Sequence, residues 1–199
     1  MYGSSNPNIL THNPAAGKKS VVLTFDDGPS RALPHILDAL EQENVPAVFF
    51  WQSRLLHPER PWERVLAEGH QIGSHSVKHV NLAALPYPQQ YEDIKNSSER
   101  IRHVTGVDVK YFRPPFGQFN DDTLLAAQAL NVVPVMWRVA SMDWELQKTP
   151  EKVITTVTDH LEDGAVILLH ELQHTADLLP ELIRAIRAQG YGFSLLPNP

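Results

Sequence analysis

Two adjacent carboxylates, Asp26 and Asp27, are the residues of this sequence best suited to chemistry. They follow the apolar run Val21–Leu23 and precede Gly28-Pro29, a pattern that predicts a buried strand ending in a turn. Two like charges side by side at a strand end are costly unless a cation or a shared proton relieves their repulsion. The acidic pair therefore indicates a functional site.

Two histidines, His75 and His79, have a spacing that is typical of metal ligands. On a helix, residues four apart share one face, so both imidazoles could reach one ion. The chain has ten histidines, so two ordinary polar residues explain the spacing equally well. Two imidazoles and one carboxylate of the acidic pair would leave positions open for water and substrate, and the other carboxylate would be free to act as a general base. The sequence has no Cys, so a thiolate site is excluded.

Four further residues could take part in chemistry, and each has an ordinary structural explanation. Arg113 precedes two prolines and could hold a carboxylate in place, but its residue type alone favours a surface salt bridge. His170 ends an apolar run, where a lone His is more often structural. Asp143 could pair with His170 and raise its pKa, so that the imidazole carries a proton. Trp144 is by default a core aromatic residue, while His174 is expected on an exposed loop.

Strands and helices alternate from residue 20 onward. Predicted strands cover 20–25, 46–51, 71–75, 111–113, 132–139, 165–169 and 192–196. Predicted helices cover 31–43, 61–68, 88–105, 121–130, 149–161 and 175–189, with Asn120 or Asp121 capping the fourth and Thr149 the fifth. Apolar strands between helices predict a parallel sheet, either an open doubly wound sheet or a barrel.

The residues with chemical potential fall at one kind of position. In both sheet types, ligands bind at the carboxyl ends of the strands. Each of these residues lies at or just after the carboxyl end of a predicted strand: Asp26, Asp27, His75, Arg113, Asp143 and His170. No glycine-rich phosphate motif follows the first strand, which disfavours a nucleotide-binding fold. We therefore expect one site where these strand ends meet.

Composition indicates one globular domain. The 199 residues are 42% hydrophobic and 20% charged, with a net charge of -6. Lys and Arg are scattered, so we expect no nucleic-acid partner, and no apolar run is long enough for a membrane span.

Residues 1–19 are expected to form an irregular lead-in to a catalytic domain over 20–199. The first residues do not resemble a signal peptide, and the sequence leaves localisation open: we expect an extracellular or cell-wall-associated protein if the chain is trimmed, and a cytoplasmic one otherwise. Oligomeric state stays open.

Five segments, in this order, resemble the motifs of polysaccharide deacetylases, also called NodB-homology domains or carbohydrate esterase family four. The segments are Thr24-Phe25-Asp26-Asp27-Gly28-Pro29, His75-Ser76-Val77-Lys78-His79, Arg113-Pro114-Pro115-Phe116-Gly117, Asp143-Trp144 and Ile167-Leu168-Leu169-His170. The resemblance runs from about Lys19 to Leu196. It implies an α/β fold with a distorted seven-stranded (β/α) barrel, similar to a TIM barrel.

The resemblance also implies a divalent metal, usually Zn²⁺, with Co²⁺ or another divalent ion as the alternative. It implies that Asp27, His75 and His79 are the metal ligands and that Asp26 is the general base. Arg113 is implied to orient Asp26. These roles come from matching positions in the family motifs.

The remaining roles that the resemblance implies concern the leaving group and the pocket. His170 is similar to the family's general acid, and Asp143 to the residue that tunes it. The backbone N–H of Phe116 is similar to an oxyanion donor. Trp144 and Leu168 are similar to walls of a pocket for the acetyl methyl group.

The family's reaction is hydrolysis of the acetamide of N-acetylglucosamine units in peptidoglycan or chitin-like glycans, which releases acetate. Two alternatives stay open: hydrolysis of a small non-sugar amide at the same metal site, and a non-catalytic carbohydrate-binding protein. Two positions depart from the family pattern. Ala140 stands where many members have an Asp, and Trp51 stands where smaller or polar residues are commoner, so we expect Trp51 to narrow the cleft.

Overall fold

The computed structural model describes residues 6–14 and 19–197. The strands are β1 (Ser20–Gly28), β2 (Ala47–Trp51), β3 (Gln71–Ser74), β4 (Tyr111–Phe112), β5 (Val133–Pro134), β6 (Val139–Ala140), β7 (Val166–His170) and β8 (Gly192–Phe193). The α-helices are α1 (Leu33–Glu43), α2 (Trp62–Ala67), α3 (Tyr87–Thr105), α4 (Asp121–Ala129), α5 (Glu151–Thr158) and α6 (Gln173–Ala188). Three short 3-10 helices are η1 (Ser53–Leu55), η2 (Leu82–Ala84) and η3 (Pro115–Gly117).

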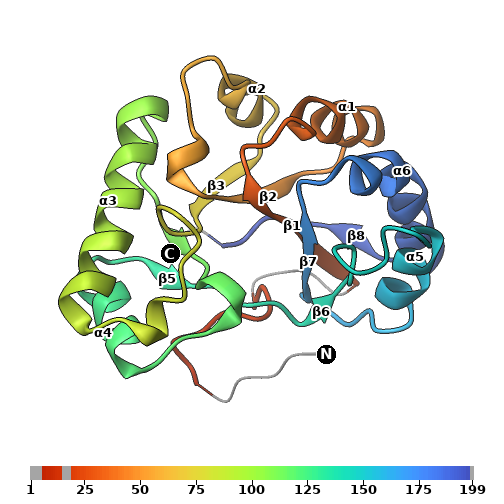
Figure 1. Cartoon of the computed structure of the whole chain (residues 1–199). Helices are drawn as coiled ribbons and strands as arrows, with labels where there is room; N and C mark the ends of the chain where they lie inside the picture. Colours follow the sequence, from red (N-terminus) through yellow and green to blue (C-terminus); the bar gives the residue numbers. More distant parts are fainter. Residues whose placement is uncertain (1–5, 15–18, 198–199) are drawn as a thin grey trace.

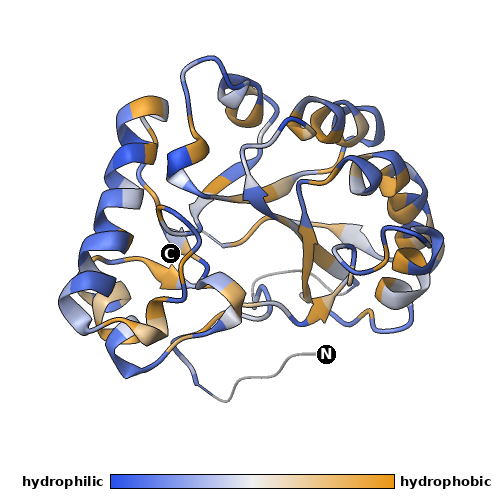
Figure 2. Ribbon diagram, in the orientation of Figure 1, coloured by the Kyte–Doolittle hydropathy of each residue, from blue (hydrophilic) through white to orange (hydrophobic). Residues whose placement is uncertain are grey.

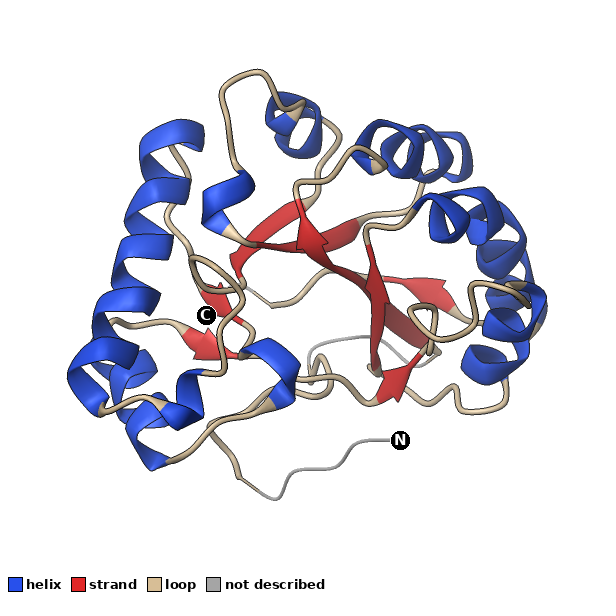
Figure 3. Ribbon diagram, viewed as in Figure 1, coloured by secondary structure: helices blue, strands red, loops and turns tan. Residues whose placement is uncertain are grey.

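The strands form one curled sheet with the helices around its outside (Figure 1 and Figure 3). Seven strands follow the order β5-β4-β3-β2-β1-β7-β6, and β8 pairs with the start of β1. All of these strand pairs are parallel. The α/β fold class and the distorted barrel predicted from the sequence are confirmed.

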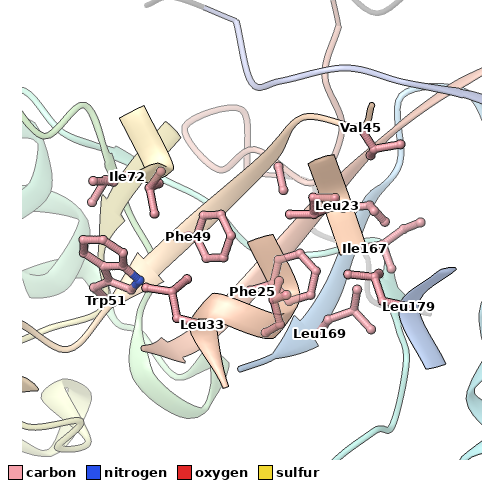
Figure 4. Packing of buried hydrophobic residues seen from close by; sticks show 14 of the residues in the cluster. Leu23, Phe25, Leu33, Val45, Phe49, Trp51, Ile72, Ile167, Leu169 and Leu179 are labelled. Carbon is pink, nitrogen blue, oxygen red and sulfur yellow. The ribbon is translucent and has the colours of Figure 1, made fainter. Parts of the chain in front are cut away.

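Side chains of β1 alternate between two layers, as the two-residue period of a strand requires. Val21, Leu23 and Phe25 belong to the large hydrophobic cluster between the sheet and the helices. Val22 belongs to the smaller cluster inside the curled sheet. Figure 4 shows the outer cluster, in which Phe25 lies beside Phe49 of β2 with ring centroids 5.3 Å apart. Figure 2 shows the corresponding hydropathy, with hydrophobic residues on the strands and hydrophilic residues on outward helix surfaces.

The predicted strand over 132–139 is wrong, because the structure divides it into β5 and β6 at opposite edges of the sheet. Between them, the backbone N–H of Val135 donates to Phe112 of β4, and that of Arg138 donates to Val166 of β7. One continuous segment therefore crosses from one sheet edge to the other. An apolar run bonded to different neighbours at its two ends cannot be told from one strand by pattern alone.

The lead-in lies across the same opening. Leu10 forms an isolated parallel bridge with Val135, and His12 forms an antiparallel bridge with Ala165. The described lead-in residues, 6–14, contain no strand or helix beyond these bridges. Main-chain hydrogen bonds of the lead-in thus occupy backbone groups near both edges of the barrel. Residues 1–5 and 15–18 of the predicted lead-in lie outside the described residues.

Helix ends agree with the sequence patterns in one case and differ in another. Asn120 caps α4, since its side chain accepts a hydrogen bond from the backbone N–H of Thr123, and the Thr123 side chain completes a capping box. The prediction that Thr149 caps the fifth helix is wrong. Pro150 occupies the cap position of α5, and no side-chain cap hydrogen bond forms there. Among the described residues, no helix combines the length and apolarity needed to cross a membrane.

Candidate metal centre and active site

The strand ends and following loops enclose one pocket of about 430 Å³. Eight of the ten residues predicted for the site line it, from β1, β7 and the loops after β3, β4 and β6: Asp26, Asp27, His75, His79, Phe116, Trp144, Leu168 and His170. The other two, Arg113 and Asp143, are fully buried, and each contacts a pocket residue. The structure thus brings together the residues that the sequence placed at separate strand ends.

A β-bulge in β1 directs both acidic side chains into the pocket. In a regular strand, neighbouring side chains point to opposite faces, so the two carboxylates would be separated by the sheet. In the register with β2, Asp26 pairs with Phe50 and Gly28 pairs with Trp51, which leaves Asp27 as an extra residue. Asp27 has a φ of 68°, in the left-handed region. Bulges of this kind redirect side chains beside functional sites.

The three predicted metal ligands converge. Asp27 Oδ1 lies 3.5 Å from His79 Nε2 and 3.8 Å from His75 Nε2, and one ligand atom from each residue lies within 4.8 Å of the others. Two ligands about 2.1 Å from an ion at a tetrahedral angle are roughly 3.4 Å apart. The spacing and the donor types therefore fit a divalent metal ion.

The hydrogen bond of His75 fixes which ring nitrogen faces the site. His75 Nδ1 lies 2.7 Å from the backbone oxygen of Arg113. A carbonyl only accepts, so Nδ1 carries the proton and Nε2 presents its lone pair toward Asp27. Burial of the ring lowers the pKa of His75, despite the opposing charges of Asp26 and Asp27. A neutral imidazole with this tautomer is the form that binds metal ions.

The expectation that His75 and His79 share a helix face is wrong. Residues 75–79 form an irregular loop in which Ser76 and His79 both have positive φ values, 67° and 58°. The Ser76 hydroxyl accepts the backbone N–H of His79 at 2.8 Å, which closes the loop. The two rings then meet edge to face with centroids 4.7 Å apart. A tight loop produces here the proximity that the spacing suggested for a helix.

Arg113 is not the surface residue that its type alone favoured; its side chain is fully buried beneath Asp26. Nη1 donates to Asp26 Oδ1 at 2.6 Å and to the hydroxyl of Thr24 at 2.8 Å. Nε and Nη2 donate to the backbone oxygens of Val135 and Met136, both at 3.1 Å. The guanidinium is thus held on three sides, and it fixes one oxygen of the Asp26 carboxylate.

Asp143 pairs with His170, as predicted. Its Oδ1 lies 2.8 Å from His170 Nδ1, and its Oδ2 accepts the His170 backbone N–H at 2.7 Å and the Thr175 hydroxyl at 2.8 Å. Burial alone would lower the pKa of His170, but the hydrogen bond and charge of Asp143 outweigh it and raise the pKa above its ordinary value. These contacts form with Ala140 at the position where many family members have an Asp.

The sequence suggested that His174 lies on an exposed loop, and this prediction is wrong. It belongs to the first turn of α6, and its Nε2 lies 2.9 Å from the backbone oxygen of Asp143. The helix begins two residues earlier than predicted, at Gln173. His174 therefore contacts the main chain of the residue that pairs with His170.

Three apolar side chains form much of the pocket wall. Trp144 packs edge to face on His170 with ring centroids 5.0 Å apart, and Leu168 lies on the neighbouring strand β7. Phe116 packs edge to face on His79 at 4.4 Å, while 61% of its surface is exposed. Its φ of 59° turns the backbone of η3 at the pocket. The pocket thus joins the candidate metal ligands to an apolar surface.

Trp51 does not narrow the cleft. It is fully buried in the outer hydrophobic cluster, and its indole N–H donates to Glu171 Oε1 at 2.8 Å (Figure 4). Glu171 follows His170 and faces the outer layer, where Oε2 accepts the Ser30 backbone N–H at 2.7 Å. Burial raises the pKa of Glu171 to about 7, against these hydrogen bonds. The sequence reasoning missed Glu171. The feature that could have indicated it is its position directly after His170, at the end of an apolar strand, where the alternation of side chains turns it to the other face of the sheet.

Gln52 is a second residue that the sequence reasoning missed. It follows β2, and its amide donates to Asp27 Oδ1 at 2.8 Å. The position after an apolar strand that neighbours the acidic pair could have indicated this contact. The bulge that brings Asp27 within reach was not visible in the sequence.

Comparison with known proteins agrees with this geometry. A family model described as polysaccharide deacetylase matches residues 13–135, and the chain belongs to this family. It is 33% identical over 188 residues to a peptidoglycan-N-acetylglucosamine deacetylase of Bacillus cereus, covering 91% of this chain and 68% of that protein. It is 31% identical over 198 residues to a bifunctional xylanase/deacetylase of Pseudobutyrivibrio xylanivorans, covering 97% of this chain but only 32% of that longer protein.

Solved structures with the same fold include both an enzyme and a pseudoenzyme. A peptidoglycan N-acetylglucosamine deacetylase superposes with a TM-score of 0.88 at 32% identity, covering 96% of this chain and 91% of that one. A carbohydrate esterase family four pseudoenzyme from Bacillus anthracis superposes with a TM-score of 0.84 at 26% identity, covering 94% and 67%. The fold therefore occurs in active enzymes and in a pseudoenzyme, and the site residues must decide between them.

Proposed function

We propose that the protein catalyses metal-dependent hydrolysis of the N-acetyl group of N-acetylglucosamine units in a glycan, releasing acetate. A peptidoglycan or chitin-like chain is the proposed substrate. The observation that carries the proposal is that Asp26 and His170, the proposed base and acid, are paired residues of adjacent strands beside the Asp27–His75–His79 cluster. The names of the peptidoglycan-deacetylating relatives support this substrate class.

Asp27, His75 and His79 would hold the divalent ion. We propose Zn²⁺, with Co²⁺ as an alternative, because two imidazoles and one carboxylate suit these ions. When bound, the ion would polarise the amide carbonyl and make the attacking water more acidic. The loop closed by Ser76 and the hydrogen bond of His75 to the backbone orient the two imidazoles.

Asp26 is the proposed general base. Arg113 engages its Oδ1, and its Oδ2 lies 3.6 Å from His75 Nε2, beside the ligand cluster. A carboxylate held in this way can accept a proton from a water that attacks the substrate carbonyl. The remaining hydrogen bonds of Arg113 to Thr24 and to backbone oxygens limit its movement, so that the base is positioned before substrate binds.

His170 is the proposed general acid. An amine leaves poorly unless it is protonated, so a proton must be available on the leaving-group side. Asp143 raises the pKa of His170 and accepts a hydrogen bond from its Nδ1–H, which leaves the Nε2 proton for the substrate nitrogen. Asp143 and the packing of Trp144 fix the plane of the ring.

The pocket wall is proposed to select the acetyl group. Trp144 and Leu168 present apolar surface to the methyl group. The backbone N–H of Phe116 is the proposed donor to the oxyanion of the tetrahedral intermediate, a type of contact worth roughly 3–4 kcal/mol of barrier in other hydrolases. The left-handed backbone at Phe116 supports this role, because it turns the main chain at the pocket.

An acetate-release assay over N-acetylglucosamine oligomers, peptidoglycan, acetylated xylan and small non-sugar amides tests the proposal. N-acetylglucosamine oligomers and peptidoglycan should release acetate, and a chelator should abolish the release. Acetylated xylan tests the specificity suggested by the xylanase/deacetylase relative. Acetate released only from small non-sugar amides would contradict the glycan substrate and leave the hydrolytic site in place.

Asp26→Asn separates catalysis from the non-catalytic alternative that the pseudoenzyme raises. We expect turnover to fall by about 10²–10⁴-fold, because the base is lost while the amide keeps the shape of the side chain. Asp159→Asn, at an exposed carboxylate after α5, is the matched control and should leave turnover unchanged. Metal-bound protein that turns over none of the substrates would indicate a binding protein.

A further inference from the structure

We propose that Gln52 is a positioning residue for Asp27 and sets the affinity of the centre for its divalent ion. The inference rests on the proposed function, because it assumes that Asp27 is a metal ligand. Its basis is a direct contact with the ligating atom. Gln52 Nε2 lies 2.8 Å from Asp27 Oδ1, the same oxygen that faces both histidine rings.

The backbone places Gln52 at the bulge. It is the first residue after β2, and its N–H donates to the backbone oxygen of Gly28 at 2.8 Å. Gln52 therefore bonds to the residue after Asp27 through its main chain and to Asp27 itself through its side chain. Only 6% of its surface is exposed, so the amide has little freedom to turn away.

The chemistry of the two groups fixes the orientation of the amide. A carboxylate oxygen only accepts hydrogen bonds, so the NH₂ end of Gln52 must face Asp27. The carbonyl end, Oε1, then lies buried, and it has no hydrogen-bond partner among the described residues. A buried carbonyl without a partner lowers stability. Gln52 thus donates to Asp27 in an arrangement that lowers the stability of the fold.

The contact has a physical effect on metal binding. The Asp27 side chain is 39% exposed, so without Gln52 its carboxylate would sample other rotamers in solvent. Binding would then have to order the side chain first, which weakens affinity. Hydrogen bonds to metal ligands typically change affinity by about 10–100-fold. Gln52 is uncharged, so its removal changes orientation without changing the net charge of the site.

Zn²⁺ titration of the metal-free protein tests the inference. Gln52→Met keeps the length of the side chain and removes the donor, and Gln52→Leu gives a second variant of different shape. Gln118→Met is the control, because Gln118 is exposed and its amide oxygen accepts a hydrogen bond from the Asn81 side chain. Affinity is read by competition with a chromophoric chelator, and folding by thermal unfolding without metal.

The expected result is a Zn²⁺ affinity about 10–100-fold lower for both Gln52 variants, with the Gln118 variant unchanged. Because Oε1 is unpaired, the metal-free Gln52 variants should unfold at or above the temperature of the parent. Parent affinity in a folded Gln52 variant overturns the inference and leaves the proposed function standing. Failure of the unaltered protein to bind Zn²⁺ overturns both.

Discussion

Glu171 gives a prediction about stability that is independent of catalysis. The residue is 4% exposed, and its carboxyl lies among the outer-layer residues behind the site. It accepts hydrogen bonds from Trp51 and Ser30, and burial still raises its pKa from 4.5 to about 7. The folded protein therefore holds a proton on Glu171 over a pH range in which the unfolded chain has lost it.

The sign and size of the effect follow from linkage. A carboxyl whose pKa is raised on folding contributes stability that is fully present below its unfolded pKa of 4.5. That stability is lost as the pH rises through about 7. A shift of this size corresponds to about 3 kcal/mol, since each pKa unit is worth roughly 1.4 kcal/mol. Unfolding of the parent should therefore become easier across this window by about that amount relative to a variant without the carboxyl.

Glu171→Gln is the perturbation, and urea unfolding from about pH 5 to about pH 8 is the assay. A chelator is added throughout, so that metal binding does not contribute to stability. We expect the free energy of unfolding of the parent to fall relative to the variant as the pH rises. Parallel profiles for the two proteins would refute the reasoning. If the variant does not fold, Trp51→Phe removes one hydrogen bond that stabilises the carboxylate, so it should raise the pKa of Glu171 further and shift the loss of stability to higher pH.

Three further predictions follow from contacts of the site. Asp143→Asn should lower the pKa of His170, which NMR titration of the ring measures; an unchanged pKa would contradict the assigned cause. Arg113→Met should destabilise the fold by about 3–5 kcal/mol, because it leaves Asp26 buried beside an apolar chain, and denaturant unfolding would detect it. Gly28→Ala should cost about 1–3 kcal/mol, since the added Cβ would overlap Glu171 Oε1, and an unshifted unfolding midpoint would count against that contact.

The strand–helix alternation was predictable because each element carries its own periodic pattern. The buried run before Asp26 and the apolar run before His170 became β1 and β7, which are adjacent in the sheet. Parallel strands present their carboxyl ends at one edge, so these two residues were expected to approach each other. The split of 132–139 was not predictable, because the two halves have similar composition and differ only in their partners.

The site residues that sequence reasoning misjudged depend on contacts between distant segments. Arg113 was expected at the surface, because its neighbours in sequence do not show that Thr24 and backbone oxygens from distant segments surround its guanidinium. Gln52 and Glu171 were overlooked because their partners lie 25 and 120 residues away in the chain. The residue pattern of a short segment gives information about neighbours in sequence. It does not show contacts between residues that lie far apart in the chain.

The sequence by itself determined which chemical groups are present and that they lie at the carboxyl ends of parallel strands. The tertiary structure decided how these groups face one another. The bulge at Asp27 puts two neighbouring carboxylates on one side of the sheet, and the loop at Ser76 brings two imidazoles together without a helix. Hydrophobic periodicity fixes the faces of strands, whereas left-handed backbone turns are stabilised by hydrogen bonds and packing from other parts of the chain.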